Sequence, residues 1–507
     1  MRGTTRTLCR CALLVVLTAL ILVPVAGARG VYTPSTDGYS MANVATQIGA
    51  TNWWNAGYTG QGVDVAVIDT GVAPVAGLNG SGKVIYGPDL SLESQAPSLT
   101  RYDTYGHGTF IAGLIAGKDP TLTTPFSAAP ATAYRGVAPN ARIVSIKVAT
   151  ADGGADVSQV IAAIYWVVQH AKDNGMNIRV INLSYGTNSR QTYQVDPLSY
   201  AAQLAWKKGI VVVAAAGNSG YQQAGSATTL ANPAYNPYVI GVGSYDTNGT
   251  SATSDDTVAS YSAGASGRKP DFVAAGSHLQ GLRVPNSYVD MTHPEGYVDA
   301  RYFRGSGTSF AAAITSGAIA LVLQKYPTLT PDQVKRYITA NARLLGGAGA
   351  ETQGSGAMNL IAMLGATPAS YTQSFTNGSG SGSLELARGT DHLTKDGVVL
   401  TGEKDIFGKS FSATSIAIKA NSSGTWTGGT WNTSAWSGSS WSGNSWSGNS
   451  WSGNSWSGNS WSSGYWSGNS WSGNSWSGNS WSGNSWSGNS WSSGVWAGGS
   501  WLGATWD

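Results

Sequence analysis

Charged side chains are scarce in this chain: Asp, Glu, Lys and Arg make up 11% of its 507 residues, well below the usual quarter. The 29 Lys and Arg nearly balance the 26 Asp and Glu, and the formal net charge is +3. Three of the arginines precede residue 12. Without them 26 basic residues face 26 acidic ones, so nothing favours nucleic acid as a partner.

Cysteine is almost absent. Cys9 and Cys11 both lie in an N-terminal stretch (1–28) that resembles an export signal: a basic start, an apolar run over 12–25, and the small residues Ala26-Gly27-Ala28 as a cleavage site. The apolar run is short for the alternative, a membrane anchor. We therefore expect a secreted protein, extracellular or attached to the cell surface, whose mature form has no disulfide or cysteine ligand.

The central region, residues 48–365, alternates apolar β-branched runs with helical stretches. This pattern is typical of a parallel sheet covered on both faces, and it predicts a doubly wound α/β domain with a mostly parallel sheet. We expect strands over 63–68, 143–148, 178–183, 210–215 and 238–242, and helices over 156–170, 198–208 and 331–342.

Three segments flank this domain. Residues 29–47 are a polar lead-in, and residues 366–425 are interpreted as a small β-rich linker module with a strand-like patch at 397–401. From Trp426 to Trp506 a tryptophan recurs every five residues, mostly as Trp-Ser-Gly-Asn-Ser. This repeat (426–507) fits neither a helix nor a strand period. It predicts either a strand-and-turn coil that stacks its own indoles or a disordered tail.

Three motifs in the central domain carry reactive groups, in the order Asp, His, Ser. Asp69 ends an apolar strand and precedes Thr70-Gly71, and His107 lies within Gly106-His107-Gly108-Thr109. Ser309 ends Gly305-Ser306-Gly307-Thr308-Ser309, just before a long helical stretch. A serine at a helix N-terminus lies where the helix dipole favours developing negative charge.

These motifs resemble the active-site signatures of the subtilisin-like serine proteases, the subtilases, which share the same chain order. The resemblance spans about Ile48 to Leu364 and implies a subtilisin-like fold with a triad of Asp69, His107 and Ser309. Asn218, in Ala214-Ala215-Ala216-Gly217-Asn218, matches the family's oxyanion-hole Asn. The implied activity is a secreted serine endopeptidase that hydrolyses proteins through an acyl-enzyme.

The resemblance also implies where substrate binds. The family holds its substrate as an added β-strand, and by similarity Ser184-Tyr185-Gly186 and the turn with Gly153 and Gly154 would flank that strand. The chemistry needs no cofactor and we see no metal-ligand motif, although calcium often stabilises this family. Side-chain preference cannot be derived from these residues.

The chain departs from the family pattern at several points. Phe110 stands where a second His is usual, and Ala275 and Ala313 replace prolines. The stretch before residue 48 is also much shorter than the usual folding propeptide, so we expect the domain to fold unaided or with help from the lead-in or from residues 366–425.

An alternative from another class is a surface-binding protein. Exposed indoles stack on sugar rings, so the repeats could bind glycans or a cell wall while the protease domain is inactive. Self-stacking, disorder and assembly between chains remain open for the tail, and a tethered active protease combines both hypotheses. We expect the protease domain itself to be monomeric.

Overall fold

The computed structural model describes residues 31–95, 98–123, 125–221, 230–395 and 398–436. The chain divides into two compact units, Met1–Tyr32 and Thr33–Asp507, and the second carries the features discussed below. The predicted export signal (1–28) and most of the Trp repeats lie outside the described residues, so those predictions remain untested.

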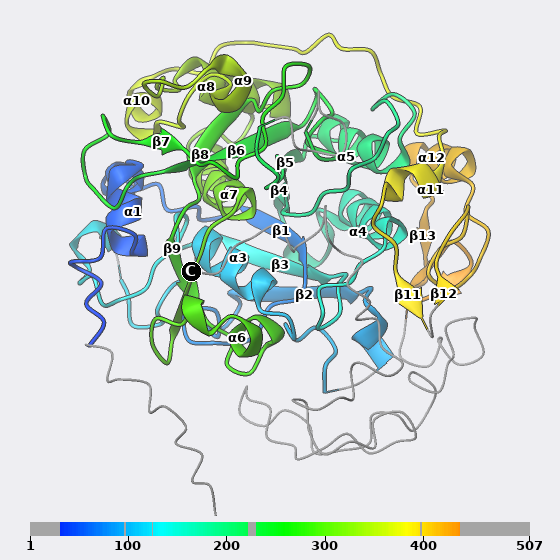
Figure 1. The fold of residues 1–507 in the computed structure, drawn as a ribbon, viewed down its shortest axis with the longest axis horizontal. Coiled ribbons are helices and arrows are strands. Elements are labelled where there is room, and N and C mark those ends of the chain that lie inside the picture. Colours follow the sequence, from blue (N-terminus) through cyan, green and yellow to red (C-terminus); the bar gives the residue numbers. More distant parts are fainter. Residues whose placement is uncertain (1–30, 96–97, 124, 222–229, 396–397, 437–507) are drawn as a thin grey trace, which may run out of the picture. The chain divides into compact units, whose positions relative to one another are not determined.

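A single eight-stranded sheet forms the centre of the second unit (Figure 1). Its strands follow the order β2-β3-β1-β4-β5-β6-β7, and β8 pairs with β6. All pairings are parallel except that between β6 and β7. The strands are β1 (Asp64–Asp69), β2 (Val84–Asp89), β3 (Arg142–Lys147), β4 (Ile178–Leu183), β5 (Val211–Ala215), β6 (Ile240–Asp246), β7 (Thr257–Val258) and β8 (Phe272–Ala275).

The predicted mostly parallel α/β sheet is thus confirmed. Each of the five predicted strands overlaps an observed one, because each is a continuous apolar run. All six residues of β1 are buried, and since neighbouring side chains on a strand point to opposite faces, both faces of the sheet are covered there.

Two pairs of long helices pack against the sheet, α3 with α7 and α4 with α5. The long helices are α3 (His107–Ala116), α4 (Val157–His170), α5 (Pro197–Lys207), α7 (Thr308–Lys325) and α8 (Pro331–Ala340). By length and composition α7 could cross a membrane, but 89% of it is buried inside the protein. It is the central core helix, which explains why it is apolar all round.

Shorter elements complete the domain. The helices are α1 (Met41–Gln47), α2 (Ala50–Asn55), α6 (Tyr288–Thr292), α9 (Ala350–Gln353) and α10 (Leu360–Gly365), and β9 (Leu279–Leu282) pairs antiparallel with β10 (Tyr302–Gly305). The predicted lead-in contains α1, whose Ser40 cap accepts from the Asn43 N–H. The Met41 N–H donates to Gln280 of β9 at 2.9 Å, so the lead-in packs against the domain.

Residues 366–425 contain more helix than strand, which corrects the β-rich prediction. They form α11 (Leu384–Arg388) and α12 (Ala413–Asn421), whereas β11 (Thr394–Lys395) and β12 (Val398–Val399) are two residues each. Each helix begins after a serine, Ser383 and Ser412, whose hydroxyl caps the first turn. The many Ser and Thr residues that suggested a linker therefore include helix caps.

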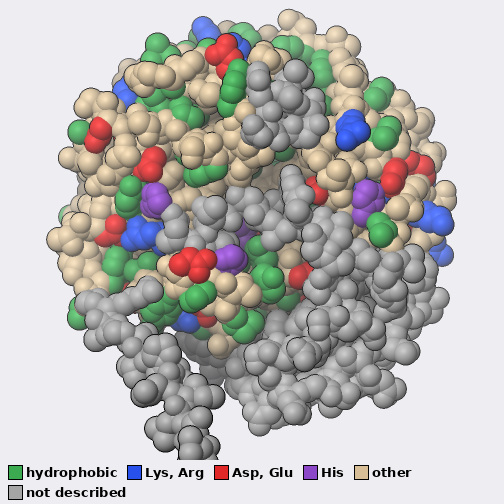
Figure 2. Space-filling view, viewed as in Figure 1, with side chains coloured by type: hydrophobic (Ala, Val, Ile, Leu, Met, Phe, Trp, Pro, Cys, Tyr) green, Lys and Arg blue, Asp and Glu red, His purple; other side chains and the backbone are tan. Residues whose placement is uncertain are grey.

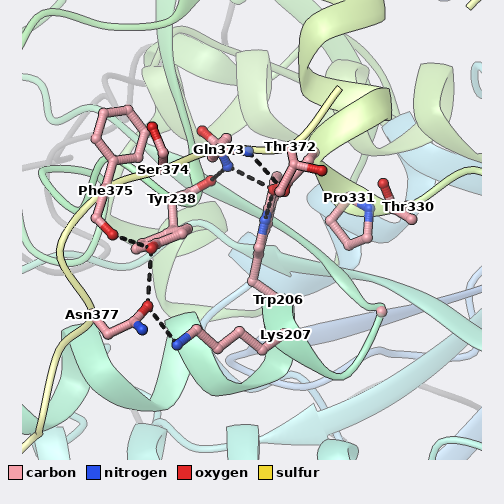
Figure 3. Close-up of a pocket in the computed structure, with 12 residues that line it drawn as sticks. Trp206, Lys207, Tyr238, Thr330, Pro331, Thr372, Gln373, Ser374, Phe375 and Asn377 are labelled. Atoms are coloured by element: carbon pink, nitrogen blue, oxygen red, sulfur yellow. Dashed lines mark hydrogen bonds between the residues drawn. The ribbon is translucent and has the colours of Figure 1, made fainter. Parts of the chain in front are cut away.

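The stretch that leads to α11 lies along the surface of the domain and is tied to it by hydrogen bonds (Figure 3). The Gln373 side chain donates to Asp332 Oδ1 at 2.8 Å and to the Tyr238 carbonyl at 3.0 Å. Asn377 accepts from Lys207 Nζ at 2.6 Å and from the Tyr238 hydroxyl at 2.9 Å. Residues 366–383 are therefore bound to α5 and α8 rather than acting as a free linker.

The first Trp repeats form a small antiparallel sheet of β13 (Trp426–Thr427), β14 (Thr430–Trp431) and β15 (Ser434–Ala435). Trp426 and Trp431 face each other in register, with ring centroids 6.5 Å apart. Trp431 is fully buried, and the Trp426 indole N–H donates to the Ala162 carbonyl of α4 at 3.0 Å. These residues have the predicted strand-and-turn form; for 437–507 it remains a prediction.

Candidate active site

Asp69 and His107 meet through the ends of two elements. Asp69 is the last residue of β1 and His107 the first of α3. His107 Nδ1 lies 2.9 Å from Oδ1 and 3.1 Å from Oδ2 of Asp69, and the Thr70 N–H donates to Oδ1 at 2.8 Å. Burial raises the pKa of the Asp69 carboxyl, and the neighbouring His107 and the Thr70 hydrogen bond oppose that rise.

Glycines around His107 allow the close approach of α3 to β1. Gly106 caps α3 with φ of 109°, a left-handed conformation that favours glycine. A Cβ on Gly108 would lie 2.2 Å from the Gly71 carbonyl oxygen. The Gly-His-Gly pattern is therefore required by the geometry that seats the imidazole on Asp69.

Ser309 lies on α7, which packs against α3. Ser309 is the second residue of α7, and the ring of Phe310 lies 4.5 Å from that of Phe110 and 5.8 Å from that of His107, between centroids. Phe110 thus fills the interface between the helices that carry the histidine and the serine. Phe110, which stands where the family usually has a second His, therefore packs beside the site.

Asn218 lies against the residue before the serine. The Thr308 N–H and the Thr308 hydroxyl both donate to Asn218 Oδ1 at 2.8 Å. Because a backbone N–H can only donate, the oxygen of the amide must face Thr308. The Nδ2 group is therefore turned away from Thr308 and held in one orientation.

The predicted substrate segments lie close to the serine on one flank and close to α3 on the other. Ser184 follows directly after β4; its carbonyl oxygen lies 3.4 Å from Ser309 Oγ, and its hydroxyl donates to the Ser309 carbonyl at 3.0 Å. Tyr185 and Gly186 continue from it and are buried.

On the other flank, Gly153 and Gly154 form the turn between β3 and α4. A Cβ on Gly153 would lie 3.1 Å from the ring of Tyr105, two residues before His107. One predicted segment therefore lies beside Ser309, and the other lies beside the loop that leads to His107.

Asp103 was missed by the sequence analysis. Its buried carboxylate accepts hydrogen bonds from the Thr70 hydroxyl at 2.8 Å and from the Gly106 and Thr109 N–H groups at 2.7 Å. It thus ties the end of β1 to the start of α3. Asp is a residue type that often accepts hydrogen bonds from the first turn of a helix, and its position four residues before His107 is the one local signal for this role.

The buried pair of Lys147 and Glu93 was also missed. Both side chains have no exposed surface, and Glu93 also accepts from the Thr104 hydroxyl and the Ala151 N–H at 2.8 Å. The pair joins the loop before α3 to the turn that carries Gly153. Nothing in the sequence marks these two charges as partners, because they are 54 residues apart.

The described residues contain no group of three or more His, Cys, Asp or Glu side chains that could hold a metal ion. No calcium site can therefore be assigned to them.

Known proteins match this chain over the region that contains Asp69, His107 and Ser309. The model of the Subtilase family matches residues 60–380. "Serine protease AprX" of Bacillus subtilis (strain 168) is 38% identical over 287 residues, which are 55% of this chain and 61% of the relative. "Subtilisin DY" of Bacillus licheniformis is 35% identical over 291 residues, 57% of this chain and 87% of the relative.

A solved structure has the same fold. Fervidolysin from Fervidobacterium pennivorans, described as a keratinolytic enzyme related to subtilisin, superposes with a TM-score of 0.50 at 24% identity. The match covers 67% of this chain and 48% of that protein. With the family match over more than half of its length, the chain belongs to the subtilase family.

Proposed function

We propose that the protein is a secreted serine endopeptidase that hydrolyses proteins or peptides, with Ser309 as nucleophile, His107 as base and Asp69 as the carboxylate that orients the base. The single observation that carries this proposal is the 2.9 Å contact between His107 Nδ1 and Asp69 Oδ1. His107 begins α3, and α3 packs against α7, the helix that carries Ser309. The family match supports the reaction class.

The contact between His107 and Asp69 supports these roles in the first step. With Nδ1 of His107 bound to Asp69, Nε2 is the nitrogen that takes the Ser309 proton as Oγ attacks the carbonyl carbon. Asp69 stabilises the imidazolium that forms. The proton then passes to the leaving amine, and the acyl-enzyme remains. Water next attacks the acyl carbon while His107 takes its proton, and that proton returns to Ser309 as the carboxylic acid product leaves.

The oxyanion of the tetrahedral intermediate needs donors that are held in place. The first donor is Nδ2 of Asn218, whose orientation is fixed because Thr308 holds the amide oxygen. The second is the N–H of Ser309, which lies in the first turn of α7, where amides have no intrahelical acceptor. The N-terminal end of the α7 dipole adds to this stabilisation.

The test compares the wild-type protein with Ser309→Ala and with Ser422→Ala, an exposed serine of the C-terminal segment. We expect wild type and Ser422→Ala to hydrolyse casein equally and Ser309→Ala to lose on the order of 10⁶-fold in kcat. Folded wild-type protein without activity, or an active Ser309→Ala protein, would overturn the proposal.

As a second function we propose that the Trp repeats attach the protease to a glycan surface such as a cell wall. The regular indole spacing in the sequence motivates this, but Trp426 and Trp431 are buried and serve the fold. Attachment would therefore fall to residues after 436. Full-length protein should sediment with insoluble peptidoglycan, chitin or cellulose, and a variant ending at residue 436 should stay in solution; equal behaviour of the two would refute the tether.

A further inference from the structure

Residues 387–393 contact Gly154 on one flank of the proposed substrate position and, on the other flank, the two residues that follow Ser184-Tyr185-Gly186. They begin with the last two residues of α11 and lie beyond the family match, which ends at residue 380. In Figure 1, α11 and α12 lie beside α4 and α5. This part of the C-terminal segment therefore reaches the substrate region from outside the family's core.

On one flank the contact is made by hydrogen bonds just after Ser184-Tyr185-Gly186. The Thr187 hydroxyl donates to the Ala387 carbonyl at 2.6 Å. Asn188 accepts from the Thr390 N–H and donates to the Thr390 hydroxyl, both at 2.8 Å. Gly389 is so close to Asn188 that a Cβ there would overlap it.

On the other flank the contact is apolar. The Leu393 side chain is buried, and its Cδ2 atom would lie 3.2 Å from a Cβ placed on Gly154. The same seven residues thus touch Gly154 and the pair Thr187–Asn188.

A buried ion pair fixes this segment in place. Arg388 and Asp156, the cap of α4, have no exposed side-chain surface and are joined at 2.6 Å. The Arg388 guanidinium also donates to the Gly402 and Lys404 carbonyls and to Glu385. With its donors satisfied by fixed acceptors, α11 is held against the start of α4.

We propose that residues 387–393 close one end of the substrate groove, so that it holds about three substrate residues on that side of the scissile bond. The inference rests on the proposed protease function. Ser184 lies at the nucleophile, and Thr187 and Asn188 come three and four residues later. A chain of that length spans at most about 10–14 Å, which is the room for three to four extended residues.

The test measures kcat/KM for fluorogenic peptides lengthened one residue at a time from two to six residues, in separate series on each side of the scissile bond. In one series kcat/KM should rise up to the third or fourth residue and then change less than twofold per residue. Gains of tenfold or more from the fifth and sixth residues in both series would overturn the proposal.

Variants locate the wall. Leu393→Ala should increase kcat/KM at least fivefold for the longest peptides of the plateau series and leave the shortest peptide unchanged. Ile416→Ala, in α12 of the same C-terminal segment, serves as the matched control and should keep the plateau. Leu393→Val gives a smaller form of the same change if Leu393→Ala does not fold, and an unchanged plateau in a folded Leu393 variant would contradict the proposal.

The two proposals fail differently. If no peptide of any length is cleaved, the protease function fails. If all are cleaved but kcat/KM keeps rising with length in both series, only the closed groove fails.

Discussion

The candidate active site and the C-terminal segment hold their polar groups by different means. Around Asp69, His107 and Thr308 the partners are backbone amides and short side chains at the ends of adjacent elements. In the C-terminal segment, Arg388 reaches a carboxylate 232 residues away, and both charges are buried. The first arrangement uses residues at the ends of strands and helices, and the second requires that the C-terminal segment is packed against α4. We therefore expect substitutions in the first to reduce catalysis and substitutions in the second to reduce stability.

Surface charge contributes little to either region. On the face seen in Figure 2, the few Lys, Arg, Asp and Glu side chains lie scattered among uncharged ones. Since exposed ion pairs contribute at most about 1 kcal/mol, the buried pairs are where single charge changes should have large effects.

The largest expected effect on stability comes from Arg388→Met. It leaves Asp156 buried without its cation, and breaking such a pair costs about 3–5 kcal/mol in the free energy of unfolding. Denaturant unfolding, in a Ser309→Ala background that prevents autolysis, measures this loss. The double variant Arg388→Met/Asp156→Asn should recover part of the lost stability, because Asn still caps α4. If the Arg388→Met protein were as stable as the parent, the buried pair would not stabilise the C-terminal segment.

The next effect is on catalysis. Asn218→Ala removes the amide donor and should lower kcat by about 10²–10³-fold with little change in KM. Thr308→Val, which removes one of the two hydrogen bonds that orient Asn218, should cause a smaller loss. If Asn218→Ala instead lowers stability and leaves kcat unchanged, its amide serves the fold rather than the reaction.

Asp69, His107 and Ser309 could each be singled out from the sequence because each lies in a short local motif, whereas the prediction that they act together rests on the resemblance to the subtilases. The Gly-His-Gly and Gly-Thr-Ser turns place reactive groups at helix starts, and the apolar run before Asp69 defines its strand. Asp103 could have been found, because it accepts from the nearby Gly106 and Thr109 N–H groups. The Lys147–Glu93 pair could not, because a contact between residues 54 positions apart leaves no periodic pattern. For the same reason the sequence did not predict that Arg388 and Leu393 lie beside the substrate segments.

The smallest expected effect is a pH dependence located in the C-terminal segment. Burial raises the pKa of the Asp391 carboxyl to about 7, with His392 opposing the rise. A carboxyl whose pKa is higher in the folded state binds its proton more tightly there, so this contribution to stability is complete at about pH 4 and is lost as pH rises to about 7.

Asp391→Asn should therefore be more stable than its parent at pH 8 and equally stable near pH 4. Unfolding in urea at both pH values, again in the Ser309→Ala background, gives the comparison. Asp173→Asn, an exposed acid after α4, is the matched control, and parallel pH curves for parent and Asp391→Asn would refute the assignment.

The most direct test of the catalytic assignment is to react the protein with a fluorophosphonate and locate the adduct by mass spectrometry. We predict one adduct, on Ser309, that forms on the wild-type protein, is absent from Ser309→Ala and forms far more slowly on His107→Ala. An adduct on another serine, or folded wild-type protein that does not react, would contradict the assignment of Asp69, His107 and Ser309 as the reacting groups.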